Sequence, residues 1–411
     1  MSGFDYRLRA PEKLITVEDY RRRARQRLPR MVWHYVDGGA DDRQTIADNR
    51  AAYSNWSLRP HMLTGVTHPS LACRVAGTDL RVPILLSPTG LTGLSYWKGD
   101  IAAARAAESR GTRYAMSSAS SWSIEEVFSA VSEPPFFQIY PRTTGVTVDL
   151  MERSWRAGCR VAFVTVDLPV AGNREGERKH GMGRPPVLTP ARALNMATRP
   201  RWTYDVLRHG RIGGRNLVAA SGLKAALESV DVQTREFMQS SLSWDDVSWI
   251  RDNWRGRLYL KGILRPDDAV RAADLGFDGI VVSNHGGRQL DFAQATLDAL
   301  PPIAAAVGGR LEILLDGGIR RGTDVVKALA LGANAVMIGR PYVYGLAAAG
   351  ERGAAAVLDI LVKELERSMI LLGVGDVAEL GPDLLARRGS SPADLGRAAA
   401  DVSPASPDRQ A

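Results

Sequence analysis

Short runs of apolar residues recur along the chain from about residue 80, and segments with helical periodicity lie between them. These runs lack polar–apolar alternation, which is typical of strands buried on both faces of a parallel sheet. The segments between them often end in glycine, a common helix stop. The predicted strands lie at residues 83–88, 113–118, 136–140, 161–167, 258–262, 279–284, 312–318 and 335–340.

This alternation predicts the fold class. Eight strands with seven or eight helical crossovers indicate an α/β protein built as a (β/α)8 TIM barrel. A doubly wound sheet is the alternative, and it usually carries the glycine pattern Gly-x-Gly-x-x-Gly after its first strand. The sequence has no such pattern there, which favours the barrel.

Three segments fall outside the repeat. Residues 1–80 precede the first strand and are predicted to form an N-terminal helical extension to the barrel of residues 81–388. Residues 175–242 form an insertion after the fourth strand, far longer than an ordinary loop and with a helical stretch near 222–240. Residues 389–411 are small, polar and proline-containing, so we expect a disordered tail.

The composition is that of a soluble globular protein, with 45% hydrophobic and 24% charged residues among 411. Cys73 and Cys159 are the two cysteines and form no CxxC pair, which argues against a disulfide scaffold and fits a reducing compartment. The first residues lack the apolar core of a secretory signal. No segment reaches the roughly 18–20 uninterrupted apolar residues of a membrane span. We therefore expect a cytoplasmic protein.

A net charge of +8 raises the question of a nucleic-acid partner. The densest basic run, residues 21–27, lies within a helical pattern and is interpreted as a solvated helix face. No nucleic-acid motif accompanies it, so we predict no nucleic-acid partner and expect the charge to gather small anions. The six histidines show no paired ligand spacing, and no metal site is predicted.

The segment SNHGGRQLD (283–291) carries the strongest candidate chemistry. His285 follows a buried strand, and an imidazole can take a proton from a hydroxyl group or an α-carbon near neutral pH. Two glycines then allow a tight turn, and Arg288 can hold a carboxylate in bidentate fashion in the same pocket. A capping histidine beside a surface arginine is the structural alternative.

Glycine-rich turns after the seventh and eighth strands predict a phosphate site. DGGIRRG (316–322) and MIGR (337–340) expose backbone N–H groups, and Arg320 and Arg340 add positive charge. Ordinary turn glycines are the alternative reading.

Lys261 ends an apolar strand, where a lysine either forms a Schiff base or supplies a fixed cation beside an electron-accepting ring. The first reading makes the protein an aldolase and the second a flavoenzyme. In the second, Ser117, Gln138 and Thr165 would bond to the ring, and Asp167 would orient His285. A flavoenzyme of other chemistry and a non-catalytic phosphate-binding barrel are further alternatives.

Taken together, the motifs resemble the FMN-dependent α-hydroxy acid dehydrogenases and oxidases, the glycolate oxidase-like family. The resemblance covers about residues 14–375 and implies oxidation of an L-2-hydroxy acid to the 2-keto acid with FMN as cofactor. It rests on LPRMVWHYVDGGADD (28–42), SPTGL (87–91), FQIY (137–140), TVDLP (165–169), LKGIL (260–264), SNHGGRQLD (283–291), DGGIRRGTDV (316–325) and IGRP (338–341).

The resemblance also implies residue roles. His285 would be the base, paired with Asp167, and Lys261 would lie near the N1 edge of the flavin. The substrate carboxylate would be bound by Arg288 and Arg174 with help from Tyr35 and Tyr140. The remaining flavin contacts would come from Pro88, Thr89, Gly90, Ser117, Gln138, Thr165, Ser283, Asp316, Gly318, Arg320, Gly339 and Arg340.

Two positions indicate a subclass. Gly90 stands where many of the oxidases have alanine, and the mandelate dehydrogenases and bacterial respiratory lactate dehydrogenases share this glycine. Ala119 stands where glycolate oxidase has a tryptophan, as in mandelate dehydrogenase, and the loss of that bulk leaves room for an aryl or other large side chain. We therefore expect mandelate or another aromatic 2-hydroxy acid as substrate, with L-lactate as the alternative. The resemblance implies a quinone, another carrier or oxygen as electron acceptor, and a homotetramer by analogy with the family.

The insertion resembles the segment by which respiratory members of the family attach to membranes. RPRWTYDVLRHG (199–210) combines aromatic residues with arginines, as interfacial segments do. Peripheral contact with the inner face of the cell membrane is therefore one interpretation. A soluble lid or a subunit contact is the other.

Overall fold

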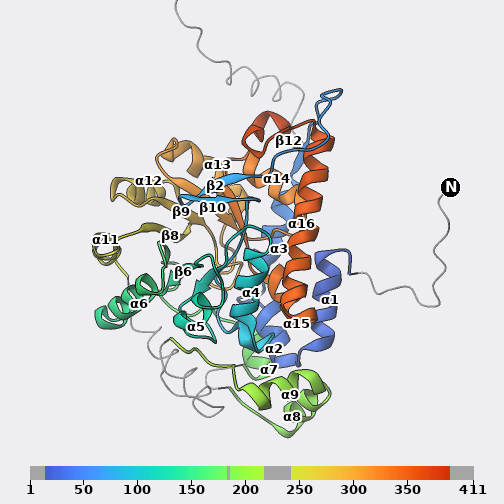
Figure 1. Cartoon of the computed structure of the whole chain (residues 1–411), viewed down its shortest axis with the longest axis vertical. Helices are drawn as coiled ribbons and strands as arrows, with labels where there is room; N and C mark the ends of the chain where they lie inside the picture. Colours follow the sequence, from blue (N-terminus) through green and yellow to red (C-terminus); the bar gives the residue numbers. More distant parts are fainter. Residues whose placement is uncertain (1–13, 183–185, 217–241, 389–411) are drawn as a thin grey trace, which may run out of the picture.

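A closed barrel of parallel strands forms the centre of the protein in the computed structural model, which describes residues 14–182, 186–216 and 242–388 (Figure 1). The eight strands follow the order β4-β11-β10-β9-β8-β7-β6-β5 around the sheet. They are β4 (Ile84–Leu86), β5 (Ala115–Ser117), β6 (Phe136–Ile139), β7 (Val161–Thr165), β8 (Arg257–Ile263), β9 (Gly279–Val282), β10 (Glu312–Asp316) and β11 (Ala335–Ile338).

A parallel bridge between Leu86 and Tyr114 joins the two ends of this sheet, and the Leu86 N–H donates to the Arg113 carbonyl at 3.0 Å. The predicted (β/α)8 TIM barrel is therefore confirmed. Several strands end earlier than the apolar runs suggested, because their last residues leave the ladder and form the rim of the barrel.

Helices cover the outside of the barrel in the predicted order (Figure 1). The long α16 was not among the predicted helices; it packs against α14, α15 and α4. The covering helices are α4 (Gly99–Glu108), α5 (Ile124–Phe128), α6 (Thr144–Arg156), α11 (Trp244–Asn253), α12 (Pro266–Asp274), α13 (Thr296–Val307), α14 (Gly322–Ala330), α15 (Arg340–Ala349) and α16 (Glu351–Leu372).

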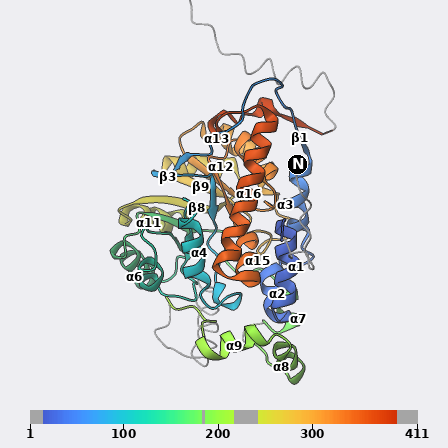
Figure 2. The same ribbon diagram turned by 45° about the vertical axis from the view of Figure 1, so that its right-hand side comes forward.

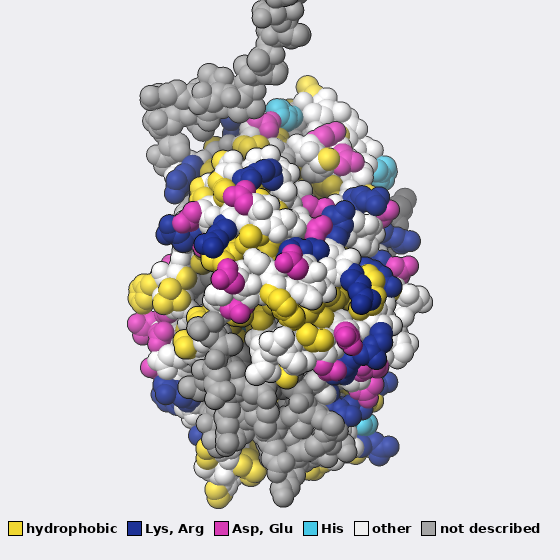
Figure 3. All heavy atoms as spheres, turned by 90° about the vertical axis from the view of Figure 1, so that its left-hand side faces the viewer, with side chains coloured by type: hydrophobic (Ala, Val, Ile, Leu, Met, Phe, Trp, Pro, Cys, Tyr) yellow, Lys and Arg dark blue, Asp and Glu magenta, His cyan; other side chains and the backbone are white. Residues whose placement is uncertain are grey.

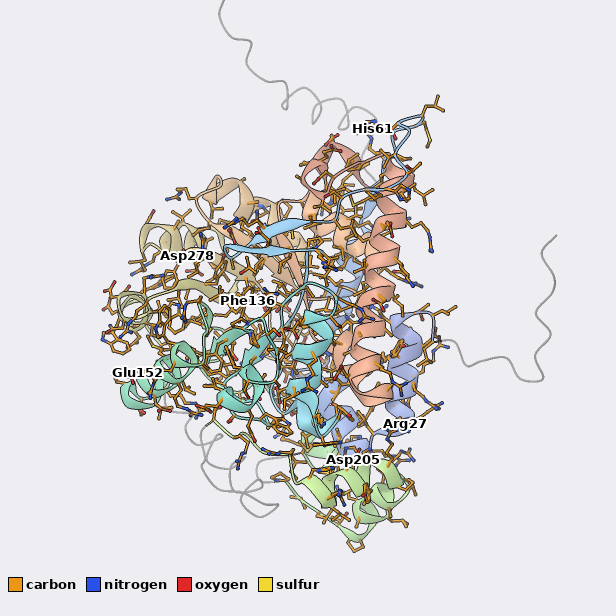
Figure 4. The ribbon with its side chains drawn as sticks, viewed as in Figure 1. Arg27, His61, Phe136, Glu152, Asp205 and Asp278 are labelled. Carbon is orange, nitrogen blue, oxygen red and sulfur yellow. The ribbon has the colours of Figure 1, made fainter. Side chains whose placement is uncertain are left out.

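Side chains fill the interior of the barrel, so that it is a packed core rather than a pore. Phe136, Phe163 and Tyr259 point inward from consecutive strands, with ring centroids 6.0 Å and 5.4 Å apart. Figure 4 places Phe136 near the middle of the molecule, whereas Glu152 of α6 lies at the outer edge. A hairpin of β2 (Cys73–Val75) and β3 (Thr78–Leu80) adds Val75 and Leu80 to the same core.

The N-terminal segment contains the expected helices and also short strands that the sequence analysis did not predict. α1 (Val17–Arg27) packs against α15, and α2 (Arg30–Asp37) lies beside α7 (Figures 1 and 2). α3 (Gln44–Ser54) leads into β1 (Trp56–Leu58), which pairs antiparallel with β12 (Leu385–Arg387). Short 3-10 turns, η1 (Thr92–Leu94), η2 (Val377–Glu379) and η3 (Pro382–Leu384), complete the connections.

The described part of the insertion after β7 contains three helices, which lie at one end of the barrel (Figure 2). They are α7 (Glu175–His180), α8 (Pro190–Ala197) and α9 (Pro200–His209). The predicted helix near 222–240 and the predicted tail at 389–411 lie outside the described residues. Among the helices that the structure describes, none is both long and apolar enough to cross a membrane.

Charged side chains of both signs are mixed on the face shown in Figure 3. Basic and acidic side chains alternate there with apolar ones. The described side chains on this face form no extended basic stripe of the kind that follows a phosphate backbone.

Candidate active site

The carboxyl ends of the strands surround one cavity with an empty volume of about 1570 Å³, part of it open to solvent. Active sites of TIM barrels lie at this end. Most of the predicted site residues meet here, although they come from distant parts of the chain. Those that line the cavity are Tyr35, Pro88, Thr89, Gly90, Tyr140, Thr165, Arg174, Lys261, His285, Arg288, Asp316, Gly318, Arg320, Gly339 and Arg340.

Backbone conformation sets the direction of His285. After β9 the chain adopts left-handed φ values at His285, Gly286 and Gly287, of 58°, 65° and 72°. A residue with a side chain in this region costs about 1–2 kcal/mol, so the turn must be held by its surroundings. The Ser283 hydroxyl accepts the His285 N–H at 3.1 Å, and the turn points the imidazole into the cavity.

Asp167, just after β7, is the partner of this imidazole. Its Oδ1 lies 2.9 Å from His285 Nδ1. Burial alone would raise the pKa of Asp167, but the nearby His285 and Lys261 outweigh burial and hold the pKa below its usual value. An ionised Asp167 accepts from Nδ1–H, an assignment made from the hydrogen-bond network. Nε2 is then available to accept a proton.

The Tyr140 hydroxyl lies on the other side of the imidazole, 3.5 Å from His285 Nε2. Burial, together with the Asp167 carboxylate, raises the pKa of Tyr140 well above its usual value. The phenol therefore stays protonated and can donate a hydrogen bond to an oxygen atom bound between Tyr140 and His285.

Arg288 and Arg174 lie together at the mouth of the cavity. Arg288 Nη1 donates to the Tyr35 carbonyl at 2.7 Å, and Arg174 Nε donates to the Arg288 carbonyl at 3.1 Å. A third charged group, Glu177 of α7, forms an ion pair of 2.9 Å with Arg288 Nη2. Sequence reasoning missed Glu177, because its proximity to Arg288 arises only when α7 folds back over the rim.

Lys261 is buried at the floor of the cavity, with 4% of its surface exposed. Its Nζ lies 2.7 Å from Asp316 Oδ2 and donates to the Ser283 hydroxyl at 2.7 Å. An ammonium group held in this way is a fixed cation, whereas a Schiff base requires a free lone pair on the nitrogen.

Ser117, Gln138 and Thr165 form a buried row across β5, β6 and β7. Ser117 Oγ donates to Gln138 Oε1 at 2.8 Å, and Gln138 Nε2 donates to Thr165 Oγ1 at 2.9 Å. Of these three residues, only Thr165 lines the cavity. Ser117 and Gln138 are fully buried, as is Ser283 after β9. Their predicted contacts with a ring stay predictions.

The far end of the cavity is shaped for an anion. Arg320 Nε and Arg340 Nε are buried and have no hydrogen-bond partner among the described residues. Burial lowers the pKa of Arg340 to about 10. A Cβ on Gly318 would lie 2.0 Å from the Asn49 carbonyl oxygen, so only glycine fits that turn. In the part of the chain that the structure describes, no cluster of side chains could hold a metal ion.

Comparisons with known proteins agree with this geometry. The model of the FMN-dependent dehydrogenase family matches residues 24–387. An L-lactate dehydrogenase of Stenotrophomonas maltophilia is 43% identical over 372 residues, which cover 89% of this chain and 97% of that protein. An L-lactate dehydrogenase of Caulobacter vibrioides is 42% identical over 374 residues, covering 90% and 97%.

Solved structures show the same likeness. The crystal structure of the monotopic membrane protein (S)-mandelate dehydrogenase superposes with a TM-score of 0.88 at 37% identity, covering 92% of this chain and all of that one. A soluble mutant of the membrane-associated (S)-mandelate dehydrogenase from Pseudomonas putida gives a TM-score of 0.77 at 36% identity, covering 92% and 100%.

The contact between α2 and α7 predicts a pH-dependent stability. His34 stacks on His180 with ring centroids 3.7 Å apart, and burial followed by the adjacent His180 lowers the pKa of His34 to about 4. The folded state therefore binds this proton less readily than the unfolded state. The contribution of His34 is complete above the ordinary histidine pKa of 6.5 and is lost as the pH falls toward 4.

We expect His34→Gln to reduce the fall in melting temperature between neutral and mildly acidic pH, measured by thermal unfolding. His68→Gln, at an exposed position, is the control and should behave like the wild type. An identical pH dependence in His34→Gln and wild type would show that this stack does not titrate.

Proposed function

Given that the chain belongs to the FMN-dependent dehydrogenase family, with FMN as cofactor and a 2-hydroxy acid as substrate, we propose that it oxidises an aromatic L-2-hydroxy acid such as mandelate. The observation that carries this proposal is the wall formed by Gly90 and Ala119. Both line the cavity, and a Cβ on Gly90 would lie 3.2 Å from the Ala119 Cβ. Neither residue has a side chain that extends beyond Cβ, so this wall of the cavity leaves space for an aryl group.

The residues at the rim fit FMN. A phosphate group would supply acceptors for the unpartnered Arg320 Nε and Arg340 Nε, and ribityl hydroxyls would satisfy Asp316 Oδ1, which is buried without a partner in the described structure. FMN, when bound, supplies a ring that accepts two electrons. Its binding would involve Pro88, Thr89, Gly90, Ser117, Gln138, Thr165, Lys261, Ser283, Asp316, Gly318, Arg320, Gly339 and Arg340.

The side chains that line the cavity then have different roles in the reaction. Arg288 and Arg174, with Tyr35 and Tyr140, bind the substrate carboxylate and fix the direction of the α-carbon. His285 Nε2 takes a proton from the substrate, and Asp167 stabilises the imidazolium that forms. The Lys261 ammonium stays as a fixed charge. Its pairing with Asp316 opposes the aldolase alternative.

The overall reaction removes two electrons and two protons from the hydroxy acid and yields the 2-keto acid. The electrons then pass to a quinone, another carrier or oxygen, which we propose as the acceptor classes. L-lactate is the second candidate substrate, because the curated relatives with 42–43% identity are named L-lactate dehydrogenases.

Anaerobic reduction of the bound flavin tests the substrate. We expect (S)-mandelate to bleach the flavin more efficiently than L-lactate does. Replacing Ala119 by Trp should lower the efficiency with mandelate by about 10-fold or more, because a single misfit methylene already costs about 10- to 200-fold. L-lactate, which needs less room, should be affected little.

Ala119→Ser, which adds one atom, is the matched control, and flavin content reports correct folding. A preference for L-lactate in the wild type would favour the second candidate. Equal efficiency of wild type and Ala119→Trp with mandelate would contradict the proposed aryl pocket. Reoxidation of the reduced protein by air or by a short-chain quinone identifies the acceptor.

We propose further that α8, α9 and the segment before them contact a membrane surface. α9 holds to the barrel through Trp202, whose Nε1 donates to the Leu94 carbonyl at 2.6 Å. Large apolar side chains point away from the barrel, and the solved relative described as a monotopic membrane protein supports a peripheral contact. The exposed residues and their exposed fractions are Val187 52%, Leu188 64%, Leu194 69%, Tyr204 58% and Leu207 74%.

Binding to lipid vesicles tests this contact. We expect the protein to sediment with vesicles that contain anionic lipid, since Arg201 and Arg208 of α9 accompany the apolar residues. Leu194→Asp combined with Leu207→Asp should reduce binding by at least about 10-fold, because each buried CH2 contributes about 0.8 kcal/mol. Leu371→Asp, equally exposed on α16, should bind like the wild type. Unchanged binding of the double variant would favour a lid or a subunit contact.

A further inference from the structure

Glu177 places a buried negative charge between the two arginines assigned to the substrate carboxylate. Its Oε1 lies 2.9 Å from Arg288 Nη2 and its Oε2 lies 4.0 Å from Arg174 Nη1. The Glu177 side chain is 8% exposed and lines the same cavity as both arginines. A carboxylate in this position either orients the arginines for the substrate or competes with the substrate for them.

The hydrogen bonds of Arg288 decide between these roles. A guanidinium has five N–H donors. Arg288 Nη1 donates to the Tyr35 carbonyl at 2.7 Å and to the Gly38 carbonyl at 3.3 Å, and Nη2 donates to Glu177. Arg288 Nε has no hydrogen bond to any residue that the structure describes. The Nε–H and the second Nη2–H are therefore left for a ligand.

Nε and Nη2 lie on one edge of the guanidinium, and such an edge can hold a carboxylate in bidentate fashion. The guanidinium also lies over the Tyr35 ring, 5.1 Å from its centroid. The Tyr35 and Gly38 carbonyls bind Nη1 of Arg288, and Glu177 binds Nη2. Together these contacts fix which edge faces the cavity.

The position of Glu177 is itself fixed by α7. The Glu177 carbonyl accepts the Met182 N–H at 2.8 Å, and His180 of the same helix stacks on His34 of α2. Arg174 at the start of α7 donates through Nη2 to Gln289 Oε1 at 3.0 Å. The helix therefore cannot easily carry Glu177 away to make room for a substrate.

We propose that Glu177 is a positioning residue for the substrate clamp. It holds Arg288 so that the Nε–Nη2 edge faces the substrate carboxylate. It also offsets one of the two arginine charges. Arg174, Arg288 and Glu177 together then carry one positive charge, which matches a singly negative acid. The inference deepens the proposed function and rests on it. Glu177 acts through Arg288 and takes no part in proton or electron transfer.

The binding of oxalate to the FMN-loaded protein tests the proposal. Oxalate, a dicarboxylate, can place one carboxylate on the clamp and has no hydrogen on carbon, so titration of the flavin absorbance reports binding without turnover. We expect Glu177→Ala to raise the Kd for oxalate by about 10-fold or more, because a charge-assisted hydrogen bond that orients Arg288 is lost. Glu177→Gln keeps an acceptor oxygen and should lose less. The rate constant for flavin reduction at saturating substrate should change little in both.

A double-mutant cycle separates positioning from a general structural effect. In an Arg288→Lys background, Glu177→Ala should no longer change the Kd for oxalate. Glu175→Gln, exposed on the same helix, is the matched control and should bind oxalate like the wild type.

Two results would overturn the proposal. Tighter oxalate binding by Glu177→Ala or Glu177→Gln would mean that Glu177 competes with the substrate. The same loss with and without Arg288 would mean that Glu177 only stabilises α7. A wild-type protein whose flavin no 2-hydroxy acid reduces would instead contradict the proposed function, so the two failures are distinguishable.

Discussion

The turn that follows β9 is the constraint on which the site depends. Three successive residues with left-handed φ values, His285, Gly286 and Gly287, let the chain reverse within the rim of the barrel. A Cβ on Gly286 would lie 2.9 Å from Arg340 Nη1, and the Gly287 carbonyl accepts the Ala40 N–H at 2.9 Å. One turn thus directs the proposed base into the cavity, leaves room for the Arg340 guanidinium and contacts the N-terminal segment.

Charge balance links the two ends of the cavity. At the mouth, Arg288 and Arg174 share Glu177, which leaves room for one further negative charge. At the far end, Arg340 donates to the Gly286 and Gly38 carbonyls and forms no ion pair with a carboxylate of the described residues, and burial lowers its pKa. Buried cations without a counter-ion are costly, so both ends favour anionic ligands.

Sequence reasoning could predict the parts of the site that local pattern determines. The apolar runs identified the eight strands, and SNHGGR and DGGIRR directed attention to strand ends that line the cavity, because the active sites of such barrels lie at that end. It could not predict contacts between distant segments. Glu177 contacts Arg288 although 111 residues separate them in the sequence, and the β2–β3 hairpin enters the barrel core although it precedes the predicted barrel strands. Such contacts depend on how the helices and the extension pack over the rim.

Likewise, the predicted helical extension proved to contain β1, which pairs with β12 near the other end of the described chain. A three-residue strand carries too little periodicity to be recognised before its partner is known. The roles of individual residues were also not predictable from sequence alone. Ser117 and Gln138 have the expected polar side chains, but they are fully buried and bonded to each other.

The most direct test of the account is the rate constant for anaerobic flavin reduction in His285→Asn, compared with wild type under saturating substrate. Loss of a positioned base should lower this rate constant by about 10²- to 10⁴-fold while the protein keeps its yellow flavin and its affinity for oxalate. Reduction at the wild-type rate would contradict the assignment of His285, and with it the central role of the turn after β9.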